Sequence, residues 1–291
     1  MHVSTRAYLL LALSMLSWGV ANPLSDIAME TLDVSHMLLL EVGAGAAVLS
    51  IVALIRRTRL SFSWRWALLL GVLEPGLTYL FGNIGYASGT VTVGLIIMSA
   101  ETLILALLAR LVLNELISRR EYVAIAIGFL GAATVGWSGQ SDGTTSLVAG
   151  AAFLLAATAA AGYALAIRLY TTKQPHVDVF GLTWAQTLVS LVLAVVLLPT
   201  ASAPVSSLLQ VDVHILAALG AGVFGVAIPF WLFAQASAFV PSRHAAIALN
   251  IIPVVGISIG ALLGRGIPTS VQIFGGALVI ISLMALSQRE H

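Results

Sequence analysis

Uninterrupted apolar stretches recur along the whole sequence, and each is about as long as a helix that crosses a membrane. One crossing needs about 20 apolar residues. Ten stretches meet this length, at residues 5–26, 35–55, 64–86, 91–113, 120–137, 145–168, 178–198, 212–236, 243–264 and 268–287. Because only short loops and two tails remain, we expect no soluble domain and predict an all-α integral membrane protein with ten transmembrane helices.

The composition agrees with lipid as the main solvent. Of 291 residues, 59% are hydrophobic and 9% are charged, and the mean hydropathy is +1.04, whereas a soluble domain is about 25% charged. The net charge of +1 indicates no nucleic-acid partner, and the absence of cysteine excludes disulfides and thiolate chemistry. The apolar run after Arg6 is too long for a signal peptide and further spans follow it, so we interpret it as the first helix.

The basic residues lie almost entirely on one side of the predicted helices. Lys and Arg gather in the cytoplasmic loops of membrane proteins. With the N-terminus placed inside, 12 of the 13 Lys and Arg residues fall on the cytoplasmic side, and only Arg265 falls outside. The sequence therefore predicts a multi-pass protein of a bacterial-type inner membrane, with both termini in the cytoplasm.

The two halves of the chain resemble each other. Residues 71–88, GVLEPGLTYLFGNIGYAS, and residues 220–237, GAGVFGVAIPFWLFAQAS, are identical at five positions at an offset of 149 (220 minus 71). This alignment places the third predicted helix on the eighth, so residues 1–142 and 143–291 are predicted to be two five-helix repeats. Because five is odd, the second repeat enters the membrane the other way up. Inverted repeats of this kind are typical of secondary transporters.

Short motifs in both halves carry a resemblance to a known family. They are Trp18-Gly19, Leu113-Asn114-Glu115, Gly128-x-x-Gly131, residues 220–237, Asn250-Ile-Ile-Pro253 and Leu263-Gly264. In order and spacing, and over nearly the whole chain, this set resembles the drug/metabolite transporter superfamily, specifically its EamA-type ten-helix exporters. The aromatic content is similar to that of the YddG-like aromatic amino-acid exporters. The resemblance implies export of amino acids or related metabolites.

Polar and aromatic residues recur at helical spacing on four predicted helices. Residues at i, i+4, i+7 and i+8 share one face of a helix, whereas a face toward lipid is expected to carry Leu, Ile and Val. The four stripes are Ser14, Trp18, Asn22 and Ser25; Pro75, Tyr79, Asn83 and Tyr86; Thr183, Gln186, Thr187 and Ser190; and Phe224, Ile228, Trp231 and Gln235. They predict a central cavity lined by rings and amides. The alternative is packing and hydrogen bonding inside the bundle.

Three carboxylates, Glu41, Glu74 and Glu101, lie within apolar spans. An ionised carboxylate at the centre of a bilayer costs several kcal/mol, so such residues are paired, protonated or in contact with water. Glu74 and Glu101 are the stronger functional candidates, because either could exchange protons or hold a substrate's ammonium group. The alternative is a neutral carboxyl group hydrogen-bonded to a neighbouring helix. In the repeat, Asn250 takes the place of Glu101.

Three prolines, Pro75, Pro229 and Pro253, interrupt predicted helices near mid-membrane. Proline has no amide hydrogen, so each one frees a backbone carbonyl of the preceding turn. The freed carbonyl can accept a hydrogen bond from a ligand, or the proline simply permits a bend.

These features together predict a secondary transporter that exports small metabolites by alternating access. Aromatic or large neutral amino acids are the expected substrates and protons the candidate coupling ion, while no cofactor or metal is expected. The predicted substrate-binding residues are Trp18, Asn22, Glu74, Tyr79, Asn83, Glu101, Tyr163, Gln186, Trp231, Gln235 and Asn250.

Two other functions remain open at this point. An uncoupled facilitator or channel for small organic solutes fits the same residues. An intramembrane serine enzyme is less favoured, because Ser138 of Gly136-Trp137-Ser138-Gly139 lies at the outer end of a predicted helix and no histidine lies in mid-membrane.

Overall fold

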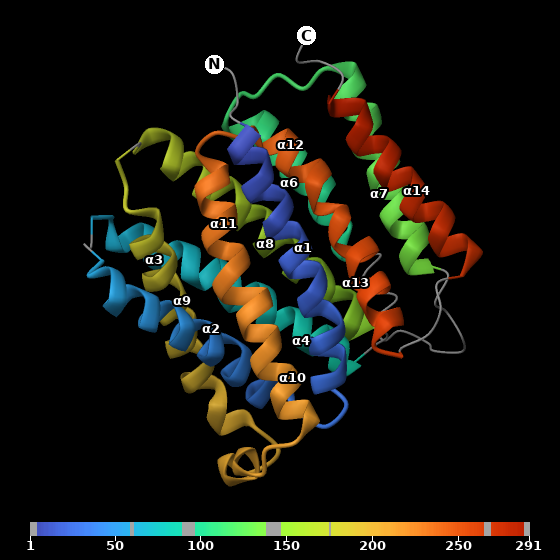
Figure 1. Ribbon diagram of the computed structural model, residues 1–291. Helices are drawn as coiled ribbons and strands as arrows, with labels where there is room; N and C mark the ends of the chain where they lie inside the picture. The colour runs from blue at the N-terminus through green and yellow to red at the C-terminus, as the bar shows by residue number, and fades with distance from the viewer. Residues whose placement is uncertain are drawn as a thin grey trace.

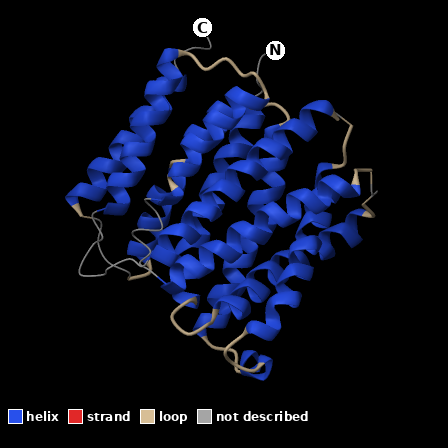
Figure 2. Ribbon diagram, turned by 180° about the vertical axis from the view of Figure 1, so that it is seen from behind, coloured by secondary structure: helices blue, strands red, loops and turns tan. Residues whose placement is uncertain are grey.

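The computed structural model of the protein describes residues 5–58, 61–88, 97–137, 147–174, 176–264 and 269–287. Within these residues the regular elements are all helical (Figure 2). Residues 91–96, Ser138, Gly139 and Arg265, on which predictions were made, lie outside the described residues.

The helices of the first half follow the predicted apolar stretches. They are α1 (Thr5–Ala28), α2 (Val34–Arg56), α3 (Trp64–Gly71), the π-helical η1 (Val72–Leu77), α4 (Thr78–Ser88), α6 (Ala100–Val112) and α7 (Arg119–Trp137). α3, η1 and α4 follow one another without a loop. The helical backbone is broken within η1 at Glu74, whose backbone is extended at φ −153° and ψ 130°.

The helices of the second half repeat this order. They are α8 (Leu147–Lys173), α9 (Val179–Leu197), two short 3-10 turns η2 (Leu198–Thr200) and η3 (Val205–Leu209), α10 (Val213–Gly222), the π-helical η4 (Val223–Ala227), α11 (Ile228–Ser237), α12 (Ser242–Leu249), α13 (Ile251–Leu262) and α14 (Ser270–Ser287). A π-helical segment thus interrupts the third predicted helix of each half.

Among the described residues, seven helical segments are long and apolar enough to cross a membrane, which agrees with a multi-pass membrane protein. They are Thr5–Ala28, Val34–Arg56, Trp64–Ser88, Leu147–Lys173, Val179–Thr200, Val213–Ser237 and Ser242–Leu262. α6, α7 and α14 occupy the other three predicted ranges. Of these, α6 has 13 residues, and α7 begins with Arg119, Arg120 and Glu121. Ten membrane crossings therefore remain a prediction, and so does the side on which the termini lie.

Acidic caps fix where several helices begin, since the first amides of a helix have no partner within it. Asp33 accepts a hydrogen bond from His36 N at 2.9 Å before α2, and Asp178 accepts one from Gly181 N at 3.0 Å before α9. Asp212 accepts from His214 N and Ile215 N, both at 3.0 Å, before α10. The bond from Ile215 N and the bond from the His214 ring lower the pKa of Asp212.

Most contacts between a helix of one half and a helix of the other have a counterpart in which the corresponding helices of the opposite halves meet. α3 and η1 pack on α9, and in the corresponding way α10 and η4 pack on α2; α4 packs on α8, and α11 packs on α1. α6 contacts α8 just as α13 contacts α1, while α2 contacts α9. α7 and α14 lie side by side at one edge of the bundle, and α1 begins at the same end at which α14 finishes (Figure 1).

Two glycines make the closest of these approaches possible. A Cβ atom at Gly71 would overlap the carbonyl oxygen of Gln186 in α9, and one at Gly222 would overlap that of Glu41 in α2. Small residues let membrane helices approach at backbone distance. Gly71 and Gly222 therefore set the spacing between the halves at two comparable crossings.

Replacing Gly222 by Ala should destabilise the bundle, because the added methyl group has a backbone as its obstacle and not a flexible side chain. Overpacking of this kind costs about 1–3 kcal/mol. Thermal unfolding of the purified protein in detergent measures the effect. Gly150→Ala is the matched control, since a Cβ atom there meets nothing within 4 Å. Equal melting temperatures for the two variants would contradict the close crossing.

Candidate functional site

A cavity of about 160 Å³ lies between the two halves. Its walls come from α1, α2, η1, α4 and α6 of the first half and from α8, α11, α12 and α13 of the second. Most residues of the stripes predicted on α1 and α4 line it, whereas Ser14 is buried and donates to Pro229 O at 2.9 Å. Eight of the predicted binding residues line it: Trp18, Asn22, Glu74, Tyr79, Asn83, Glu101, Tyr163 and Asn250.

Three predicted binding residues lie elsewhere, and the prediction that they face this cavity is corrected. Gln186 is fully buried behind the wall, where its Nε2 donates to the Tyr163 hydroxyl at 3.2 Å. Trp231 and Gln235 line a second pocket, together with Arg6 and Arg56. The Arg56 guanidinium lies 5.3 Å from the centre of the Trp231 ring.

The polar stripe of α9 serves packing between helices. Thr183 and Thr187 donate to carbonyls of their own helix, at 2.9 Å each, and Ser190 donates to Gly71 O. On α11 and η4, Phe224 is 39% exposed and so faces outward. Helical periodicity showed that these residues share a helix face. It could not show whether that face lines a cavity or packs against a neighbouring helix.

Glu74 and Glu101 differ from Glu41 in their partners, and Glu101 is only partly buried, whereas Glu41 and Glu74 are buried. Glu41 is 1% exposed and its Oε1 accepts a hydrogen bond from Asn83 Nδ2 at 2.7 Å. Glu74 occupies the extended break in η1, and Glu101 lies in the first turn of α6. Both of these residues line the cavity. Within the described part of the chain, no group of three His, Asp or Glu side chains could hold a metal ion.

Asn250 is a residue of the cavity wall whose amide has no hydrogen-bond partner. It lies at the junction of α12 and α13, is 1% exposed, and neither its Oδ1 nor its Nδ2 has a hydrogen-bond partner. Gly128 of α7 lets it fit, because a Cβ atom there would lie 2.5 Å from Asn250 Nδ2. Leaving a buried polar group unpaired costs about 1–3 kcal/mol, so a hydrogen-bonding partner for this amide would stabilise the protein.

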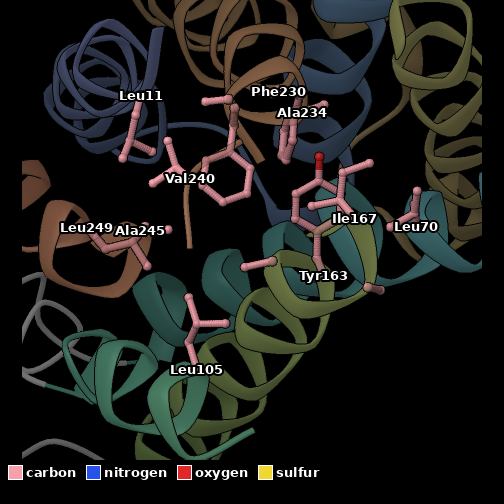
Figure 3. Packing of buried hydrophobic residues seen from close by; sticks show 14 of the residues in the cluster. Leu11, Leu70, Leu105, Tyr163, Ile167, Phe230, Ala234, Val240, Ala245 and Leu249 are labelled. Atoms are coloured by element: carbon pink, nitrogen blue, oxygen red, sulfur yellow. The ribbon is translucent and has the colours of Figure 1, made fainter. Parts of the chain in front are cut away.

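Aromatic rings form one wall of the cavity. Trp18 and Tyr163 both meet Phe230 edge to face, at ring-centre distances of 5.3 Å each. Figure 3 shows Tyr163 and Phe230 side by side within the packed core. Tyr86 meets Phe153 in the same manner at 5.2 Å. Rings in this geometry are held firmly and offer edges and faces to an apolar ligand.

The carbonyls freed by two prolines are already used by the protein. Pro229 leaves Gly225 O without its helical donor, and this oxygen accepts from Trp18 Nε1 at 2.8 Å and from the Tyr79 hydroxyl. Pro75 leaves Gly71 O in the same way, and Ser190 Oγ donates to it at 2.6 Å. The sequence left open a hydrogen bond to a ligand or a simple bend; instead, both carbonyls accept hydrogen bonds from side chains of the protein.

A cluster of charged residues closes the end of the bundle at which α1 begins. Glu121 accepts from Arg243 Nε at 2.6 Å, and Glu115 lies 3.7 Å from Arg168 Nε and 3.8 Å from Arg243 Nη1. His244 Nδ1 lies 2.6 Å from the Tyr8 hydroxyl. Residues of both halves take part, so the cluster joins them across this end.

One residue of this cluster, Glu115, belongs to the motif Leu113-Asn114-Glu115, which the sequence analysis used for the family resemblance. Asn114 has a left-handed backbone at φ 53°, a conformation that Asn tolerates better than most residues. It ends α6 and directs Glu115 toward Arg168 and Arg243. The role of Glu121 and Arg243 was not found from the sequence, because no spacing rule joins residues so far apart in the chain.

Replacing Ser190 by Ala should destabilise the protein, since Gly71 O then loses the donor that replaces its helical bond. A buried carbonyl left unpaired costs about 1–3 kcal/mol. Thermal unfolding in detergent checks this. Ser258→Ala is the control, because Ser258 is exposed and its Oγ donates to Val254 O of its own helix, which keeps its helical bonding. A Ser190→Ala protein as stable as this control would show that the hydrogen bond from Ser190 to Gly71 O does not stabilise the break at Pro75.

Comparison with known proteins gives the family and the fold. The profile of the EamA-like transporter family matches residues 5–137 and again residues 149–288. A crystal structure described only as that of a protein superposes with a TM-score of 0.80, covering 97% of this chain and 96% of the other at 16% identity. No curated protein matches the sequence. At that identity the structural match speaks for the fold alone.

Proposed function

The chain belongs to the EamA-like transporter family, and from that premise we propose that it is a secondary transporter exporting small organic molecules across the inner membrane. The observation that carries the proposal is the central cavity, whose wall contains three carboxylates and an unpaired amide contributed by both halves. A purely structural membrane protein has no need of such groups within its apolar segments.

The substrate is proposed to carry an apolar ring and an amino group. Trp18, Tyr79 and Tyr163 supply ring surfaces, and Glu74 and Glu101 supply acceptors for an ammonium group. The large neutral and aromatic amino acids predicted from the sequence belong to this class. A proton exchanged at one of the two carboxylates is proposed to couple export to the proton gradient.

Transport is proposed to proceed by alternating access between two inverted halves. The cluster formed by Glu115, Glu121, Arg168 and Arg243 supports a closed cytoplasmic end, because it ties the halves together where the basic residues gather. In the same proposed orientation, the lining residues Ser25 and Tyr86 support a cavity that opens toward the outer side. The pseudo-symmetric helix pairings support two halves of equal construction.

Proteoliposomes test the transport proposal. Purified protein should give saturable uptake of radiolabelled phenylalanine or a related amine, with counterflow, and an imposed pH gradient should stimulate it. Glu101→Gln should lose most of the stimulation by the pH gradient, because the neutral amide cannot exchange a proton. Glu30→Gln is the control, since Glu30 pairs with His214 in an exposed position away from the cavity.

The same assay separates the alternatives. Saturable uptake that ignores the pH gradient in wild type would identify a facilitator, and the carboxylates would then serve as substrate ligands. Flux that is linear in concentration and lacks counterflow would identify a channel.

Cysteine labelling tests the closed end, and the natural chain contains no cysteine to interfere. A Ser25→Cys variant should react with a membrane-impermeant maleimide added from outside, because Ser25 lines the cavity. Adding Arg243→Gln should lower this reactivity, since the loss of the ion pair with Glu121 favours opening of the other end.

Arg110→Gln is the control for that second change, because Arg110 is exposed and stands outside the cluster. Reaction of the Ser25→Cys variant from the cytoplasmic side alone would contradict the proposed orientation. Equal effects of the two arginine substitutions would contradict the role of the cluster.

A further inference from the structure

The charges around the central cavity are of one sign. Its lining contains Glu41, Glu74 and Glu101 and, within the described residues, no Lys, Arg or His. Residues 89–96, which follow α4 and lie outside the described part, contain no basic residue in the sequence. A ligand that enters the cavity therefore meets carboxylates and amides but no cationic partner.

The basic side chains nearest to these helices are engaged or directed elsewhere. Arg168 donates to Ser237 O at 2.7 Å and pairs with Glu115, and Arg243 pairs with Glu121. Arg6 and Arg56 line the second pocket. None of these four lines the central cavity, so a substrate's carboxylate would be buried there without a counterion, which is strongly unfavourable.

The groups without partners are of the kind that an ammonium group needs. An ammonium donates three hydrogen bonds and accepts none. Glu74 and Glu101 accept no hydrogen bond from the residues that the structure describes, whereas Glu41 already accepts one from Asn83. Asn250 Oδ1 is a third acceptor, buried and unpaired at the same cavity.

We propose that the central cavity selects organic ammonium cations that have an apolar ring and no carboxylate, with Glu74, Glu101 and Asn250 as the ligands of the ammonium group. The ring packs against the aromatic wall at Trp18 and Tyr163. This proposal rests on the proposed transport function and narrows its substrate from amino acids and amines to amines.

A matched series of four probes tests the proposal on the purified full-length protein by isothermal titration calorimetry at pH 7. Phenethylamine is the cation, phenylalanine the zwitterion, 3-phenylpropionate the anion and 2-phenylethanol the neutral compound, all with the same ring. Phenethylamine should bind at least tenfold more tightly than each of the other three. The comparison is made on wild-type protein, so it does not depend on whether a variant folds.

Variants then assign the ligands. Glu101→Gln should reduce the preference for phenethylamine over 2-phenylethanol to less than threefold, and Asn250→Ala should weaken phenethylamine binding severalfold while leaving 2-phenylethanol unchanged. Glu30→Gln, whose carboxylate lies outside the cavity, should bind all four probes as wild type does.

Several outcomes would overturn the proposal. Phenylalanine or 3-phenylpropionate binding as tightly as phenethylamine would mean that the site neutralises a carboxylate. Equal binding of 2-phenylethanol would mean that charge is not selected, and no binding of phenethylamine would remove the substrate class. Transport of phenylalanine in proteoliposomes without transport of phenethylamine would overturn this proposal and keep the proposed function, whereas the absence of any carrier-mediated flux would remove the function itself.

Discussion

Lipid offers no hydrogen bonds, so a helix that breaks inside a membrane must find replacements for its lost backbone bonds, and the centre of this protein depends on two such replacements. Pro75 frees Gly71 O, which Ser190 satisfies, and Pro229 frees Gly225 O, which Trp18 and Tyr79 satisfy. In each of these hydrogen bonds the donor lies in one half of the chain and the acceptor in the other. The breaks that give the cavity its shape therefore also join the two repeats.

This arrangement couples the cavity to the break in the second half. Trp18 and Tyr79 line the cavity and at the same time donate to Gly225 O. A ligand that stacks on either ring affects the bond that holds η4 in place. A rearrangement of the halves must keep these bonds or exchange them for others, since a free carbonyl in lipid is costly. Any movement of one half against the other would therefore act on the bonds at the two π-helical segments.

The sequence predicted the helices and the two walls at α1 and α4 because both follow from local rules. Apolar length gives a span, and a proline beside a polar stripe marks a break that needs partners. The stripes at Gln186 and at Trp231 were misplaced because periodicity defines a helix face but not the neighbour that it meets. The repeat alignment pairs Gly71 with Gly220, whereas Gly222 makes the matching approach to α2. In the structure Gly71 and Gly222 each directly precede the π-helical segment of their half, a correspondence that the sequence identities alone do not give.

The acidic residues show how partners decide what the same side chain does. Glu115 and Glu121 stand beside arginines at the end of the bundle and join the halves electrostatically. Glu41 is held by an amide, and its carbonyl oxygen lies against Gly222, so it belongs to the helix crossing as much as to the cavity. Glu74 and Glu101 have neither kind of partner within the described residues, and Asn250, which belongs to the wall of the same cavity, is also unpaired. Carboxylates and an amide kept together without internal partners are stable only when a proton or a bound cation completes them. The stability of this part of the bundle therefore depends on what occupies the cavity, which is the condition for a ligand to shift the balance between two states.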